Sequence, residues 1–252
     1  MQTQFVYRSQ FWAGLFGELA EVAAKIAIWN AVLGSGTDEG ASFSEMIAYA
    51  LIAGTVMFAW RPGDMIREVG AAIRTGDITV HMLRPVRYPL YLFAVEIGNL
   101  AFRLMAVALP VTAIVAATYG IKLPTNPLNG GLFLCYWGLS FCIIFLLALN
   151  SALMSFWLMD AEAIDWFLNG IISFLSGSIV PFWFFPDALA RIAAWLPFAW
   201  ISYYPAAVYL ERLPPASAMT TFAIGCAWAA LLAFGAGFLW RRAAHRLVVQ
   251  GG

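Results

Sequence analysis

The sequence predicts an all-α polytopic membrane protein with six transmembrane helices. Three observations lead to this prediction. The chain of 252 residues is 62% hydrophobic and 11% charged, whereas soluble domains carry about 25% charged residues. Its mean hydropathy is +0.79. Six separate stretches are apolar over roughly the 20 residues that a helix needs to cross a bilayer. The formal net charge of zero offers no basic face, so no nucleic-acid partner is expected.

The spans alternate with segments rich in turn-forming or charged residues. Before the first span, residues 1–12 mix aromatic and polar side chains, which is typical of a short interfacial helix on a membrane surface. A disordered terminus is the alternative. Turn-forming residues follow the first and third spans, at 34–40 and 120–129, because glycine and proline interrupt helices. The six expected spans are 13–33, 44–60, 90–119, 130–158, 164–181 and 217–240.

The distribution of basic residues predicts that both termini are cytoplasmic. Lys and Arg in short loops favour the cytoplasmic side of a membrane. With the N-terminus inside, nine of them face the cytoplasm and three face outside. The nine are Arg8, Arg61, Arg67, Arg74, Arg84, Arg87, Arg241, Arg242 and Arg246; the three are Lys122, Arg191 and Arg212.

The segment 61–89, between the second and third spans, has the pattern of a folded cytoplasmic element. Apolar residues recur at helical spacing up to Ile73, which predicts an amphipathic helix. Gly76 suits the position after a helix end, and Asp77 suits the start of a second, shorter helix. Pro85 stops that helix, since a proline disfavours helical backbone in the residue before it. An ordinary basic loop that anchors the topology is the alternative.

Charged side chains within two spans form stripes that invite a functional interpretation. Charge inside a membrane is costly and is a functional-site hypothesis by default. The first stripe is Glu18, Glu21 and Lys25, and the second is Glu96, Asn99 and Arg103. Each places an acid and a base on one helix face. They either line a translocation path or subunit interface, or they only orient the bundle.

The segment 182–215 is rich in aromatic residues and prolines and precedes the last span. Non-helical backbone at membrane depth must be buried in protein or line a water-filled cavity. The sequence therefore predicts a re-entrant helical hairpin on the outer side, with Trp183 and Phe184 near an outer gate. An interfacial aromatic belt without a gating role is the alternative.

Two runs of sequence resemble those of ABC-2-type transporter permeases. The run from Gly76 to Val86, GDITVHMLRPV, resembles the first cytoplasmic loop of the subfamily with a G-(D/E)-(I/L)…LLRP signature. The run from Pro181 to Pro186, PFWFFP, followed by LPF at 196–198 and YYP at 203–205, resembles the subfamily's outer stretch before the last span. The resemblance covers essentially the whole chain.

The resemblance implies the permease subunit of an ATP-driven exporter in the bacterial cytoplasmic (inner) membrane. The segment 61–89 would then be a coupling helix that docks on a separate ABC ATPase. Two ATPase copies would bind ATP and Mg, and a second permease chain, identical or homologous, would complete the assembly. The cargo would be amphipathic or lipid-like. The residues expected to couple to the ATPase are Gly76, Asp77, Arg84, Pro85 and Arg87.

Other functions require features that the sequence lacks. The only lysines, Lys25 and Lys122, do not follow a glycine, so the chain has no P-loop and no cofactor of its own is expected. His81 and His245 lie outside the spans and far apart, so neither a metal site nor catalysis is expected. A secondary transporter would need a titratable midplane site and an inverted repeat. It remains an alternative, as does a non-transporting scaffold.

Overall fold

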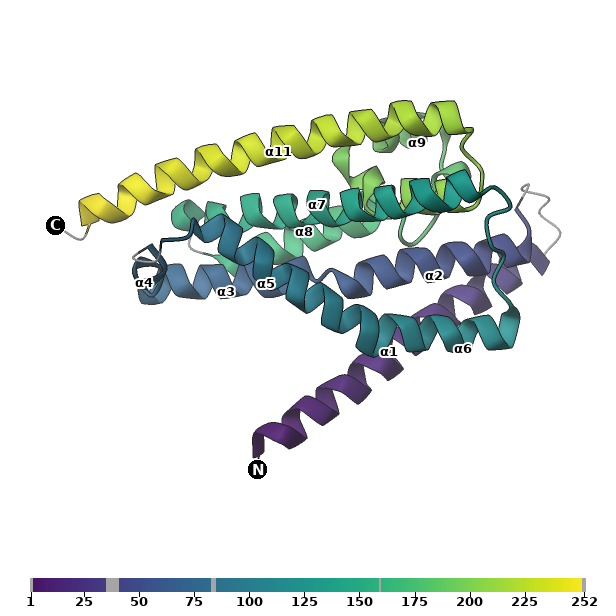
Figure 1. Cartoon of the computed structure of the whole chain (residues 1–252), viewed down its shortest axis with the longest axis horizontal. Coiled ribbons are helices and arrows are strands. Elements are labelled where there is room, and N and C mark those ends of the chain that lie inside the picture. Colours follow the sequence, from purple (N-terminus) through teal and green to yellow (C-terminus); the bar gives the residue numbers. More distant parts are fainter. Residues whose placement is uncertain (1, 35–40, 83–84, 159, 251–252) are drawn as a thin grey trace.

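The computed structural model describes residues 2–34, 41–82, 85–158 and 160–250, and these residues form helices and connecting turns without a strand. The long helices run roughly along one direction; α3 continues α2, and α6 continues α5 after a bend (Figure 1). They are α1 (Gln2–Gly34), α2 (Phe43–Ala59), α3 (Pro62–Thr75), α5 (Tyr88–Arg103), α6 (Leu109–Tyr119), α7 (Pro127–Leu158), α8 (Ala161–Leu175) and α11 (Pro215–Gln250). The predicted all-α architecture is confirmed.

Helix α7 is the central element of the bundle. It is apolar on nearly all sides and packs against α3, α8, α10 (Tyr203–Tyr209) and α11. A helix without a polar face is one that is buried or spans a membrane. Polar side chains fix its neighbours: the Tyr136 hydroxyl donates to the Ala218 carbonyl at 2.7 Å, and the Asn150 amide donates to the Leu232 carbonyl at 3.0 Å. Both bonds tie α7 to α11.

Four helical stretches are long and apolar enough to cross a membrane. They correspond to the expected second, third, fourth and sixth spans: Phe43–Thr75, Tyr88–Tyr119, Pro127–Leu158 and Pro215–Ala244. Helix α1 is long enough, but Glu18, Glu21 and Lys25 lie close together in it. Helix α8 has 15 residues, fewer than the roughly 20 that a span needs. The first and fifth spans therefore stay predictions.

Two predicted boundaries are wrong. A separate helix over 1–12 is not formed, because residues 2–34 make one continuous helix, and no proline interrupts the chain near Trp12. The N-terminal part of α1 extends away from the other helices (Figure 1). The fifth expected span, 164–181, ends early. Helix α8 stops at Leu175, and Gly177 adopts a φ of 74°, which continues no right-handed helix.

Within the described residues, the segment 61–89 contains a helix, a corner and a second, shorter helix. Helix α3 ends at Thr75, Gly76 has a φ of 81°, and the short helix α4 (Ile78–Met82) follows. Helices α2 and α3 together make a stretch of 33 residues, about 50 Å long at 1.5 Å per residue. The hydrocarbon core of a bilayer is about 30 Å thick. If α2 spans it, most of α3 lies beyond it.

The remaining chain contains a bend between α5 and α6 and a segment of short helices before α11. A π-helical turn, Leu104–Ala108, lies between α5 and α6 just before Pro110, and the two helices differ in direction there (Figure 1). Proline and π-helical turns are common causes of such a bend. Short helices then fill the segment before α11, as its prolines lead one to expect. They are Phe182–Phe184, α9 (Asp187–Trp195), Pro197–Trp200 and α10.

Candidate functional site

One face of α3 is buried in the bundle. Met65, Ile66 and Val69 are each at most 3% exposed, and the helix packs on α7 and α8. Two glycines permit this close packing. A Cβ atom added at Gly63 would overlap the carboxylate of Asp165, and one added at Gly70 would overlap the Cβ of Ala161. Helices α3 and α8 thus approach each other so closely that neither glycine position has room for a side chain.

A chain of ion pairs joins α3 to two other helices. We call Asp64, Arg67, Arg103 and Asp165 the Asp64 cluster. Arg67 on α3 pairs with Asp165 on α8 and, at 2.8 Å, with Asp64. Asp64 also accepts a hydrogen bond from Arg103 on α5 at 2.9 Å. The Asp165 side chain is 10% exposed, and buried charges need such partners. These ion pairs connect α3 directly to α5 and α8.

The corner after α3 is exposed. Gly76, Asp77, Pro85 and Arg87 all lie on the surface, and the Thr75 hydroxyl donates to the Asp77 carboxylate at 2.6 Å. The expected coupling residue Arg84 falls outside the described residues. The corner thus joins a buried, ion-paired helix to an accessible surface, and a partner protein that binds the corner would act on the bundle through α3.

A comparison with protein families agrees with this arrangement. The family described as ABC-2 family transporter protein matches residues 19–251. The chain belongs to the ABC-2 transporter family. Comparison with curated proteins and with solved structures gave no significant match. ABC-2 permeases are membrane transport components rather than enzymes, and they generally work with ABC ATPase partners.

The two charged stripes of this ABC-2 permease lie apart. In the first, Lys25 pairs with Glu21 at 2.7 Å within α1. In the second, the Asn99 amide donates to Glu96 at 3.2 Å, whereas Arg103 turns to Asp64 on α3. No hydrogen bond or ion pair joins the two stripes within the described chain. The second stripe, unlike the first, therefore connects with the segment that carries the exposed corner.

The opposite end of the permease has its own charged and aromatic contacts. Glu45, at the start of α2, pairs with Lys122 at 2.9 Å and with Arg212 at 2.8 Å. The Arg212 guanidinium lies 4.4 Å from the centre of the Trp183 ring, a cation–π distance. Phe184 stacks on Trp29 of α1 with ring centres 4.9 Å apart. The two residues expected at an outer gate therefore contact different elements of the bundle.

Glu211 links two loops at this end of the permease. Its carboxylate accepts a hydrogen bond from the Thr125 hydroxyl at 2.6 Å and from the Asn126 backbone amide at 2.8 Å. These donors favour the charged form, so the pKa of Glu211 lies below its ordinary value. A φ of 59° is uncommon for a residue with a side chain, so this contact holds a strained backbone position.

The Glu211 contact predicts a pH-dependent stability difference. A carboxyl group whose pKa is lowered by folding stabilises the protein above its unfolded pKa, about 4.3, and this contribution is lost as the pH falls through the folded pKa. We expect Glu211→Gln to melt below the wild type near neutral pH, and the gap to shrink on acidification below about pH 4. Melting temperatures of both proteins across that range measure it. A gap that stays constant contradicts the assignment.

Sequence reasoning missed the partner of Asp165. Three acidic residues, Asp160, Glu162 and Asp165, lie at the start of α8, where carboxylates suit the positive end of the helix dipole. That explanation suits Asp160, which caps α8 by accepting the Ala163 amide at 3.0 Å. Asp165 instead pairs with Arg67, 98 residues away in the sequence. The available signal was the spacing of Gly63 and Gly70, which marks a face of α3 built for close packing.

Proposed function

We propose that this ABC-2 permease is the membrane-spanning subunit of an ATP-driven exporter, and that a separate ABC ATPase drives it by binding the corner formed by α3, Gly76 and α4. The observation that carries the proposal is that α3 has both an exposed end and a buried body. One end leads to exposed residues, and its body is buried and tied by ion pairs to α5 and α8. A force applied at the corner therefore reaches elements that flank the bundle's interior.

The charge distribution supports a cytoplasmic position for the corner. Helix α4 and the C-terminal end of α11 lie at one end of the bundle, and α9 and the link between α6 and α7 lie at the other (Figure 1). The first end carries Arg74, Arg87, Arg241 and Arg242. Basic residues favour the cytoplasmic side. We therefore place the first end inside, both termini in the cytoplasm, and the whole protein in a bacterial inner membrane with six spans.

The working assembly would contain two ATPase copies, which hold the ATP and Mg, and a second permease chain, identical or homologous. ATP binding would draw the ATPases together and bias the permease between inward-open and outward-open states. A ligand shifts such an equilibrium only by its differential affinity for the two states. The contact with α3 is where this difference would enter the permease. The contacts of Trp183 and Phe184 would close the outer side, and an amphipathic or lipid-like cargo would pass between.

The test of this proposal is a charge reversal at the corner. The permease is co-expressed with candidate ABC ATPases, beginning with any encoded in adjacent genes, and purified through a tag on the permease. We expect Asp77→Lys together with Arg87→Glu to reduce the retained ATPase about tenfold, equivalent to about 1.4 kcal/mol. ATP-dependent transport in vesicles should fall in parallel.

Arg191→Glu is the matched control, since Arg191 is exposed on α9 at the opposite end of the bundle. It should leave both retention and transport unchanged. Wild-type retention and transport in the double variant would show that the corner does not bind the ATPase.

A further inference from the structure

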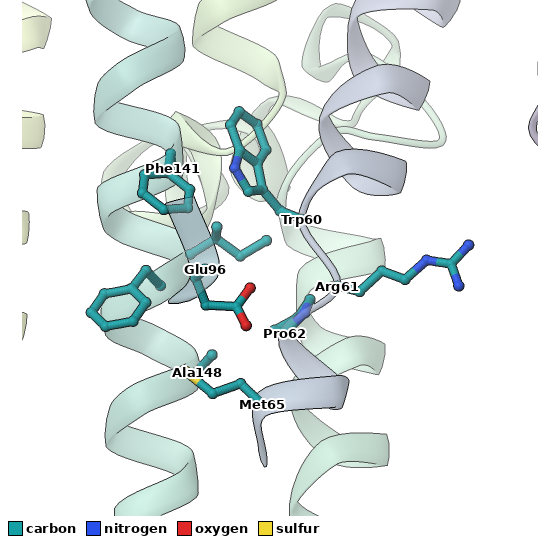
Figure 2. Close-up of a pocket in the computed structure, with 9 residues that line it drawn as sticks. Trp60, Arg61, Pro62, Met65, Glu96, Phe141 and Ala148 are labelled. Carbon is teal, nitrogen blue, oxygen red and sulfur yellow. The ribbon is translucent and has the colours of Figure 1, made fainter. Parts of the chain in front are cut away.

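A small hollow lies where α2 and α3 meet, between these helices, α5 and α7. Figure 2 shows the Glu96 carboxylate of α5 facing the break at Trp60, Arg61 and Pro62, with Phe141 of α7 on the far side. The cavity volume is about 20 Å³, which suffices for one water-sized group such as an ammonium head. The hollow adjoins an interrupted helix, since α2 ends at Ala59 and α3 begins at Pro62.

The charge of Glu96 is not balanced by an ion pair within the described residues. Its hydrogen-bond donor is the neutral Asn99 amide, at 3.2 Å. The nearest arginines are directed elsewhere: the Arg61 side chain points away from the hollow (Figure 2) and lies 4.8 Å from the Phe58 ring. Arg103 bonds to Asp64 and to the Ala59 carbonyl. A carboxylate in such a site attracts a cation.

Three aromatic rings line part of the hollow, together with Pro62, Met65, Ile144 and Ala148. Trp60 is 3% exposed, and Phe141 and Phe145 are each 7% exposed. The ring centres of Trp60 and Phe141 are 6.0 Å apart, and those of Phe141 and Phe145 are 6.4 Å apart. The faces of such rings attract organic cations, and cages of this composition bind ammonium groups.

We infer that this hollow binds the ammonium head of an amphipathic organic cation. Glu96 supplies the counter-charge, Trp60 and Phe141 supply the aromatic faces, and the apolar tail lies towards the mouth of the hollow. That such a cation is a transported substrate rests on the proposed export function. The binding site itself is a property of the permease alone. The narrow space favours a primary ammonium, which can also donate hydrogen bonds to the carboxylate.

The test measures binding to the permease alone in lipid nanodiscs, with empty nanodiscs subtracted. Three probes share one chain length and differ in charge: hexylammonium, hexanol and hexanoate. At about pH 8, where an ordinary carboxyl group is ionised, the wild type should bind hexylammonium at least about tenfold more tightly than hexanol. Hexanoate should bind most weakly, since its charge repels that of Glu96.

Two substitutions locate the binding. Glu96→Gln keeps the shape of the side chain and should abolish the preference for hexylammonium over hexanol. Phe141→Leu should weaken hexylammonium binding about three- to tenfold, as expected for the loss of one ring from a desolvated cage, and leave hexanol binding nearly unchanged. Glu162→Gln is the matched control, because it neutralises an exposed carboxylate on α8 outside the hollow, and it should retain the preference.

The inference is overturned if the wild type binds hexylammonium no better than hexanol, or if Glu96→Gln retains the preference. If Glu96→Gln does not yield folded protein, Glu96→Asp should retain the preference and Phe141→Leu should reduce it; failure of either result also overturns the inference. Binding without ATPase-driven transport would contradict the proposed export function and leave the site intact. ATPase-driven transport without ammonium binding would contradict the binding site and leave the proposed export function intact.

Discussion

Gly70→Ala should separate α3 from α8 and reduce ATP-driven transport strongly. The added Cβ would overlap the Cβ of Ala161, and neither atom belongs to a flexible side chain that could move aside. Overpacking of this kind costs about 1–3 kcal/mol. The loss of transport should exceed the loss of stability, because a shift of α3 also misplaces Arg67 relative to Asp165. Thermal unfolding in detergent and transport at matched protein amounts measure the two effects.

Gly98→Ala on α5 is the matched control, since no heavy atom lies within 4 Å of its added Cβ. Alanine is the better helix former by about 1 kcal/mol, so this variant should be neutral or slightly more stable. Gly63→Ala should cost less than Gly70→Ala, because its Cβ would overlap the Asp165 carboxylate, which is the end of a side chain that can move aside. If Gly70→Ala unfolds and transports like Gly98→Ala, the close contact between α3 and α8 is not required.

Local signals explain why much of the fold was predictable. The end of α3, the corner at Gly76 and the short α4 follow from residues adjacent in sequence: a glycine that accepts a φ of 81° and a proline at position 85. The long apolar helices likewise follow from composition over single stretches. The continuous α1 was missed because the change from polar to apolar composition near Trp12 was read as a helix boundary. Composition can change along a helix that nothing in the backbone interrupts.

The candidate site was less predictable because its contacts are long-range. The exposed positions of Gly76, Asp77 and Arg87 could be expected from their polarity. The burial of α3 could not, because it depends on α7 extending beyond the length needed to span a membrane and covering that face. Asp165 and Glu96 show the same limit. Arg67, which pairs with Asp165, and the aromatic rings that line the hollow with Glu96 come from other helices, and one sequence does not show which helices are neighbours.

Removing Arg67 should cost more stability than removing Asp165. The Asp165 side chain is 10% exposed and that of Arg67 is 48% exposed. Arg67→Ala leaves a buried carboxylate with only the Asn169 amide as a donor. Breaking a buried pair in this way costs about 3–5 kcal/mol, and the exposure of Arg67 reduces our expectation to about 2–3 kcal/mol. Asp165→Ala should cost less, since Arg67 keeps Asp64 and water as partners.

The double variant Arg67→Ala with Asp165→Ala separates a true pair from two independent effects. Without the carboxylate, the loss of Arg67 leaves no buried charge, so the double variant should be more stable than the sum of the single losses by about 1–2 kcal/mol. The pair of Lys25 and Glu21 within α1 is the control cycle, and its coupling should be about 0.5 kcal/mol or less. Additive losses at Arg67 and Asp165 would contradict the assigned pair. Coupling there, with transport lost in both single variants, would identify this ion pair as the link through which α3 acts on α8.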